Sequence, residues 1–320
     1  MDSENQNNPG NLNDSDNSFK PIMSPMTAAL FGLAAVFILY QFGGAILTLV
    51  IFGFDFEKAD VNSIRLLTIG GQILLILLPT LLLTKFIYPD VTAILRVRFP
   101  KRKEIGIFSL GLILITPLLQ SYAYIQNFFL VKLAASSPVV KSVKDFIDQL
   151  DKMVESAYGS LLVSNSIFES SFIIFVVAVI PAICEETFFR GYILKSFEYK
   201  FKPVWAALIT AIFFGIYHFN PYGLLPLIAL GFFFGFAAYK SNSIFLPMFL
   251  HFLNNFLAVT AFLILDDPDL ISSSATIDND IVSQVIIFAI LLIIFLGYIQ
   301  FVRKRFYKNE SQNITINPGI

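Results

Sequence analysis

Residues 171–197 read SFIIFVVAVIPAICEETFFRGYILKSF, and this stretch indicates the class of protein. About 20 mostly apolar residues cross the roughly 30 Å of hydrocarbon in a bilayer as a helix, so the stretch is long enough to be a membrane span. It nevertheless contains two adjacent carboxylates, Glu185 and Glu186, and the guanidinium of Arg190. An ionisable side chain inside a span costs about 3 kcal/mol or more, which makes it a functional candidate. The stretch therefore predicts a membrane helix that carries chemistry.

The composition of the whole chain supports a membrane protein. Of its 320 residues, 56% are hydrophobic and 14% are charged, whereas about 25% of the residues in a typical soluble domain are charged. The formal net charge of −1 gives no basic excess for binding nucleic acid. The single cysteine, Cys184, excludes an intramolecular disulfide and any cysteine-rich metal site. We therefore predict a protein that lies in lipid and does not bind nucleic acid.

We predict an all-α fold, a polytopic transmembrane helical bundle of about eight spans. Between the third and fourth spans, apolar residues recur at helical spacing over about 139–158 with charged residues between them. This pattern predicts one amphipathic interfacial helix, which lies on the membrane surface or packs on the spans. A lid over a binding site is the alternative role for this helix. The spans are expected at residues 27–53, 66–87, 105–131, 171–197, 203–219, 222–239, 243–265 and 281–302.

The same pattern divides the chain into five segments. We expect residues 1–20 to be a disordered tail, because they are rich in Asn, Asp and Ser and poor in apolar residues. The other segments are 21–132 with the first three spans, 133–170 with the amphipathic connection, 171–265 with spans four to seven as the catalytic core, and 266–320 with an acidic loop, the last span and a basic tail.

Basic residues cluster in three connections that lie on one side of the membrane if every span crosses it. Basic connections stay in the cytoplasm, so we expect this side, and with it both termini, to be cytoplasmic. The clusters follow spans two, four and eight, and they consist of Arg96, Arg98, Lys101, Arg102 and Lys103, of Lys195, Lys200 and Lys202, and of Arg303, Lys304, Arg305 and Lys308.

The only two histidines, His218 and His251, fall within the fifth and seventh predicted spans. At 1.5 Å per residue, Glu185 lies about 20 Å, His218 about 22 Å and His251 about 12 Å from the cytoplasmic ends of their spans. All three side chains therefore reach the middle part of the membrane, where they can converge on a site that we expect to be reachable from the cytoplasmic side.

Four neutral glutamines in the earlier spans are better explained by hydrogen bonds between helices; they are Gln41, Gln72, Gln120 and Gln126.

Helical geometry assigns these polar side chains to faces. Glu186 and Arg190 are four residues apart and can pair, so we predict that they support the site. Glu185 is rotated from Glu186 by about 100°, which lets it point towards His218.

Two further pairs share a helix face in the same way. His251 and Asn255 are four residues apart, and Phe214 stands one turn before His218. We expect Phe214 to contact the substrate.

These groups are sufficient for the hydrolysis of a peptide bond. A carboxylate and an imidazole, here Glu185 and His218, can hold and deprotonate a water molecule. A histidine and an asparagine, here His251 and Asn255, can both donate to one oxyanion. The chain lacks a Gly-x-Ser-x-Gly elbow and a His-Glu-x-x-His zinc motif. We expect no cofactor, although zinc is not excluded, because two histidines and one glutamate form a known catalytic ligand set.

Three motifs follow one another in this part of the chain: Glu185-Glu186-Thr187-Phe188-Phe189-Arg190, then Phe214 to His218, then His251 to Asn255. In order and spacing they resemble the Glu-Glu-x-x-x-Arg, Phe-x-x-x-His and His-x-x-x-Asn motifs of the CAAX protease and bacteriocin-processing family of intramembrane glutamic proteases. That family includes the Ras-converting CAAX endopeptidase and bacterial relatives labelled abortive-infection proteins. The resemblance covers roughly residues 170–260.

The resemblance implies an intramembrane endopeptidase that needs no metal. Glu185 would activate the water with His218 beside it, and His251 and Asn255 would stabilise the oxyanion. Glu186 and Arg190 would brace the site. The implied partners are membrane lipids and a peptide or membrane-protein substrate, which can be lipidated, and we expect a multi-pass protein of a bacterial inner membrane. The alternatives are a non-catalytic peptide-binding or bacteriocin-immunity protein of the same fold, a zinc-dependent peptidase and, last, a small-molecule transporter.

Overall fold

A computed structural model describes residues 22–53, 59–265 and 281–314, and every element in these ranges is helical. The predicted all-α class is therefore confirmed for the described part of the chain. The tail expected to be disordered, residues 1–20, and the acidic loop, residues 266–280, lie outside the described residues.

Among the described residues, seven helices are long and apolar enough to cross a membrane, so the prediction of a polytopic bundle is confirmed. Four of them are single helices: α6 (Arg102–Ser136), α12 (Leu224–Ser241), α13 (Phe245–Leu265) and α14 (Ile281–Ile314). The other three contain π-helical turns: α1 (Pro25–Ile38) with η1 (Leu39–Gly43) and α2 (Gly44–Phe52); α3 (Val61–Gly71) with η3 (Gln72–Leu77) and α4 (Leu78–Ile87); and α8 (Ile167–Ile174) with η4 (Phe175–Val179), α9 (Ile180–Glu186), η5 (Thr187–Ile193) and α10 (Leu194–Glu198).

The span predicted at 203–219 is the shorter helix α11 (Pro203–Tyr217), which has 15 residues. At 1.5 Å per residue it is about 22 Å long, less than the hydrocarbon layer. The helix stops because Phe219 adopts a left-handed backbone conformation, with φ of 48°, and because Pro221 cannot continue a helix. His218 therefore follows the last residue of the helix instead of lying within it.

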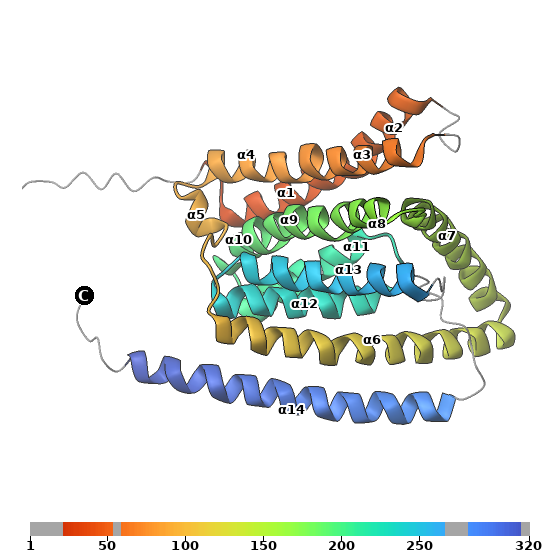
Figure 1. Cartoon of the computed structure of the whole chain (residues 1–320). Helices are drawn as coiled ribbons and strands as arrows, with labels where there is room; N and C mark the ends of the chain where they lie inside the picture. The colour runs from red at the N-terminus through yellow and green to blue at the C-terminus, as the bar shows by residue number, and fades with distance from the viewer. Residues whose placement is uncertain (1–21, 54–58, 266–280, 315–320) are drawn as a thin grey trace, which may run out of the picture.

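Figure 1 shows the fourth span between two groups of helices, with α1, α3 and α4 on one side and α13, α12, α6 and α14 on the other. Its η5 turn is buried over its full length. The fourth span thereby forms the centre of the bundle and brings the Glu-Glu pair into contact with both groups of helices.

The amphipathic helix predicted at about 139–158 is α7 (Pro138–Leu162). Apolar side chains on one of its faces, among them Val139, Phe146 and Met153, are exposed, whereas Asp151 on the other face is buried. Part of the polar face of α7 is therefore turned towards the bundle, whereas Asp145 and Lys152 are exposed and the exposed apolar side chains are left for lipid.

All three predicted basic clusters lie at the same end of the bundle, which we call the basic end. It holds α5 (Val91–Ile94), the end of α10, the starts of α6 and α11, and the end of α14, whereas α7 lies at the opposite end, which we call the α7 end (Figure 1). The connections at the basic end are tied together, because Arg96 pairs with Glu198 and the hydroxyl of Ser243 donates to the carbonyl of Arg98. That this end is cytoplasmic stays a prediction.

Candidate active site

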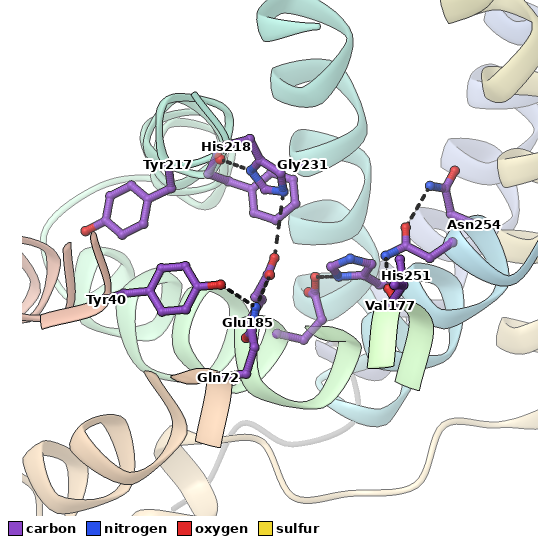
Figure 2. A network of polar contacts seen from close by, with 12 residues as sticks. Tyr40, Gln72, Val177, Glu185, Tyr217, His218, Gly231, His251 and Asn254 are labelled. Atoms are coloured by element: carbon purple, nitrogen blue, oxygen red, sulfur yellow. Dashed lines mark hydrogen bonds and ion pairs between the residues drawn. The ribbon is translucent and has the colours of Figure 1, made fainter. Parts of the chain in front are cut away.

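Glu185 lies near the end of α9, and its two carboxylate oxygens have different neighbours (Figure 2). Oε1 accepts a hydrogen bond of 3.0 Å from Nε2 of Gln72. Oε2 is 3.8 Å from Nε2 of His218 and has no hydrogen-bond partner among the described residues. One oxygen is thus held by another helix, and the other faces the imidazole.

His218 is oriented by the helix that it terminates. Its Nδ1 is 2.7 Å from the carbonyl oxygen of Phe214, one turn earlier. A carbonyl oxygen only accepts hydrogen bonds, so Nδ1 carries a proton. In the neutral ring Nε2 is then an acceptor, and this is the nitrogen that faces Glu185.

Glu186 faces the opposite way and lies in a fully buried ion cluster. Its Oε1 accepts a hydrogen bond of 2.7 Å from Nη1 of Arg190 and lies 2.8 Å from Nδ1 of His251. The pairing of Glu186 with Arg190 was expected from the helical interval. The contact with His251 was not expected, because the spacing of residues in one helix does not show which side chain a neighbouring helix brings. His251 therefore approaches a carboxylate as well as sharing a face with Asn255.

The second amino group of Arg190 donates to the carbonyl oxygen of Gly231 in α12 over 3.0 Å. A Cβ atom at Gly231 would lie 2.9 Å from the ring of Phe214 and 3.3 Å from Nη2 of Arg190. A glycine is needed here because the guanidinium and the ring approach the backbone of α12 so closely.

Aromatic rings separate and support the two acid–imidazole pairs. Phe214 lies with its ring 4.3 Å from the guanidinium carbon of Arg190 and 4.5 Å from the ring of His218, and Phe234 stacks on His251. Phe214, which was expected to contact substrate, is only 1% exposed. It borders the cavity described below, but most of its surface packs against the site itself.

Asn255 is fixed through both ends of its amide. Its Nδ2 donates to the carbonyl oxygen of Val177 over 3.0 Å, and its Oδ1 accepts from Nδ2 of Asn254 over 3.2 Å. A carboxamide has two N–H donors, so the bond to Val177 leaves one of them for a ligand.

A cavity of about 590 Å³ joins these groups. Its lining includes all four residues predicted to be catalytic, Glu185, His218, His251 and Asn255. The first two spans and α7 also contribute to the wall, with Val36, Tyr40, Gln41, Thr68, Gln72, Ile76, Val154, Glu155, Leu161 and Leu162. The cavity is large enough to hold several residues of an extended peptide or a ligand of similar size.

Residues 167–257 match a protein-family model described as "Rce1-like: Type II CAAX prenyl endopeptidase Rce1-like". In this segment the chain is similar to that family. The Rce1-like CAAX endopeptidases are peptide-bond hydrolases, and the family implies a membrane protease. The resemblance drawn from the three motifs is therefore confirmed. Searches of the curated proteins and of the solved structures found no match to the chain.

The segment that matches the Rce1-like family begins at α8 and ends within α13, so it contains the Glu-Glu pair and both histidines. It does not contain Gln72 or Tyr40, whose hydroxyl accepts a hydrogen bond of 3.3 Å from the same Gln72 amide. Sequence analysis noted Gln72 as a polar residue within a span, but nothing in its spacing indicated that its partner is Glu185.

The sequence left zinc open as a cofactor of such a peptidase. In the described part of the chain, no group of three His, Cys, Asp or Glu side chains lies close enough together to hold a metal ion. Glu185 faces His218 and Glu186 faces His251, so the two histidines have separate carboxylates. In the described residues, the two histidines therefore form two separate acid–imidazole pairs. They do not share one glutamate as a set of three metal ligands.

Proposed function

We propose that the chain is an intramembrane endopeptidase that hydrolyses a peptide bond with a water molecule activated by Glu185 and His218. The observation that carries this proposal is the approach of Glu185 Oε2 to His218 Nε2 within the cavity, at 3.8 Å. That distance is too long for a direct hydrogen bond, but one water molecule can bond to both atoms.

The proposed reaction conserves every proton. The water oxygen attacks the carbonyl carbon of the scissile bond while Glu185 takes a proton from the water. When the tetrahedral intermediate collapses, the C–N bond breaks and Glu185 returns that proton to the leaving nitrogen. His218 orients the water through Nε2, because its Nδ1–H is already bonded to the carbonyl of Phe214.

The oxyanion of the intermediate would be stabilised by His251 and Asn255. Nδ1 of His251 faces the Glu186 carboxylate and must carry a proton to donate to it. Nε2 of His251 can donate to the oxyanion when it carries a proton as well. The N–H of Asn255 that Val177 does not use provides the second donor.

The lining of the cavity favours a particular kind of substrate. Apart from the histidines and two tyrosines, the ionisable side chains among the described residues that line it are the acidic Glu155 and Glu185, and no Lys or Arg of these residues lines it. Neutral amides such as Gln41 and Asn220 alternate with apolar side chains, and amides can satisfy the backbone of a bound peptide away from water. We expect an extended, mainly apolar segment without acidic residues. A prenylated C-terminal peptide is the form of this substrate that the family suggests.

The test is turnover of quenched fluorescent peptides, prenylated and unprenylated, by the purified full-length protein. We expect Glu185→Gln and His218→Ala to lower kcat at least about 100-fold, since general acid–base groups contribute about 10² to 10⁴ in rate. Lys200→Ala, at an exposed position of the basic end, is the control and should keep wild-type activity.

Two results would overturn parts of this proposal. Full turnover by Glu185→Gln in a folded, extractable protein would remove the protease mechanism and favour a peptide-binding or immunity protein. Loss of turnover after dialysis against a strong chelator, with recovery on addition of Zn²⁺, would replace water activation by Glu185 with a zinc mechanism.

A further inference from the structure

The catalytic cavity lies towards the α7 end of the bundle. Its lining includes Val154, Glu155, Leu161 and Leu162 of α7, and Phe219 and Asn220 of the turn between α11 and α12. Figure 1 shows α7 at the end away from α5 and α10. Sequence analysis expected a site reachable from the cytoplasmic, basic end. The structure differs, because the turn after α11 and the C-terminal part of α7 fold over the opposite end of the site.

Tightly packed side chains separate the site from the basic end. All seven residues of η5, which lead from Glu186 towards that end, are buried. Leu194, Ser196 and Phe197 continue this packing in α10. None of the residues that line the cavity lies in the connections 88–101, 199–202 or 242–244. Among the described residues, packed helices therefore lie between the basic end and Glu185.

The α7 end differs in charge as well as in access. Three acidic side chains of α7 are turned inward: Asp151 is 2% exposed, Asp148 receives a hydrogen bond from the hydroxyl of Tyr222, and Glu155 lines the cavity. The basic end carries the three clusters of Lys and Arg defined above. Because α7 also carries Lys141, Lys144 and Lys152, its charges are mixed, and it lacks the basic excess of the other end.

We propose that the substrate enters from the extracytoplasmic side of the membrane, beneath α7. The proposal rests on the proposed function and on the rule that basic connections remain in the cytoplasm. If the basic end is cytoplasmic, the cavity faces the other side. The substrate is then a mainly apolar segment, with neutral or basic flanking residues, that lies in or near the extracytoplasmic half of the bilayer.

The side of each end can be measured with single cysteines. In a Cys184→Ala background, Asn165→Cys marks the link between α7 and α8, and Phe99→Cys marks the basic end; both positions are exposed and neither substitution changes the charge. We expect a membrane-impermeant maleimide to label Asn165→Cys in intact spheroplasts of a bacterial host and Phe99→Cys only after permeabilisation. The reverse pattern would overturn the proposal.

The side of substrate entry can be measured separately. An impermeant quenched peptide with an apolar centre and a basic flank is given to spheroplasts, to inverted membrane vesicles and to detergent-solubilised protein. We expect cleavage in spheroplasts and in detergent, at least about tenfold slower cleavage in inverted vesicles, and none with Glu185→Gln. Cleavage in inverted vesicles but not in spheroplasts would overturn the proposed entry side and leave the protease function intact. Detergent-solubilised wild type that cleaves none of the peptides tested would overturn the proposed function itself.

Discussion

Glu185 and Glu186 are adjacent in the chain but have different surroundings. Glu186 is fully buried and pairs with two cationic or potentially cationic groups, whereas Glu185 receives one neutral hydrogen bond and borders the cavity. A buried ion pair is expensive to form, and removing one partner leaves an uncompensated charge. Because of these different surroundings, we expect Glu186 to hold the site together and Glu185 to be the carboxylate that reacts.

At the same scale, Gln72 acts on Glu185 as a positioning residue. We expect Gln72→Met to lower kcat about tenfold with little change in KM, since one hydrogen bond to a charged group contributes about 1.5–3 kcal/mol. Gln126→Met is the matched control, because the amide of Gln126 also makes one hydrogen bond inside a span, to the carbonyl of Tyr222. Steady-state kinetics of the two purified variants checks the prediction.

Gln72→Glu distinguishes positioning from a merely structural role. The introduced carboxyl can donate to Glu185 only while it is protonated, and two adjacent carboxylates repel each other when both are ionised. The activity of Gln72→Glu relative to wild type should therefore fall as the pH rises, whereas the ratio for Gln72→Met should stay constant. A constant ratio for both variants would show that Gln72 acts only in packing.

Among the elements, α7 is held over the site at two points. Arg65 of α3 is buried and donates to the carbonyl of Leu161 over 3.0 and 2.9 Å, and it also bonds the carbonyl of Val163. A guanidinium thus binds carbonyls at the end of a helix, where they have no partner within the helix. The hydroxyl of Tyr222 bonds Asp148 near the middle of α7. These contacts join a helix outside the family match to the wall of the cavity.

We expect Arg65→Met to release the C-terminal end of α7. The change removes charged hydrogen bonds and leaves carbonyl groups without their donor, which should destabilise the docked helix by about 2 kcal/mol. Hydrogen–deuterium exchange should increase in α7 but not in α12, and the KM for peptide should change more than kcat. Lys85→Met, at the end of α4, is a control for the loss of a positive charge. Unchanged exchange in α7 would show that Arg65 does not hold this helix.

At the scale of the whole molecule, the site is assembled from both halves of the chain. The proposed catalytic residues come from α9, α13 and the turn after α11, whereas Gln72, Tyr40 and the α7 side of the cavity come from residues before 164. The family match from 167 to 257 therefore includes the proposed reactive groups but not the whole cavity. We therefore expect residues of the first half to take part in substrate selection.

This arrangement predicts that the protein can be divided at the link between α7 and α8. We expect fragments 1–164 and 165–320 to be inactive when each is produced alone and to recover peptide cleavage when they are produced together, because membrane helices that are inserted separately can associate through their packed faces. Co-purification and peptide turnover check the prediction. Activity of 165–320 alone would contradict the role of the first half.

The sequence by itself determined the helical fold, the place of the spans in the chain and the identity of the polar residues within them. Those features follow from local properties: apolar length, helical spacing and the cost of a charge in hydrocarbon. The match of the three motifs to the CAAX endopeptidase family follows from the same local information. The pairing of Glu186 with Arg190 could also be predicted, because both residues lie on one helix.

Only the tertiary structure decided which helices meet. It placed His251 on Glu186, Gln72 on Glu185 and the C-terminal part of α7 over the cavity. These contacts depend on the packing of helices from distant parts of the chain, and helical spacing does not define that packing. The tertiary structure also placed the two glutamates of residues 171–197 in different surroundings. Glu186 lies in a buried ion cluster, and Glu185 lines the cavity. The physical reason is that the two side chains lie about 100° apart around one helix, with different helices packed on each side.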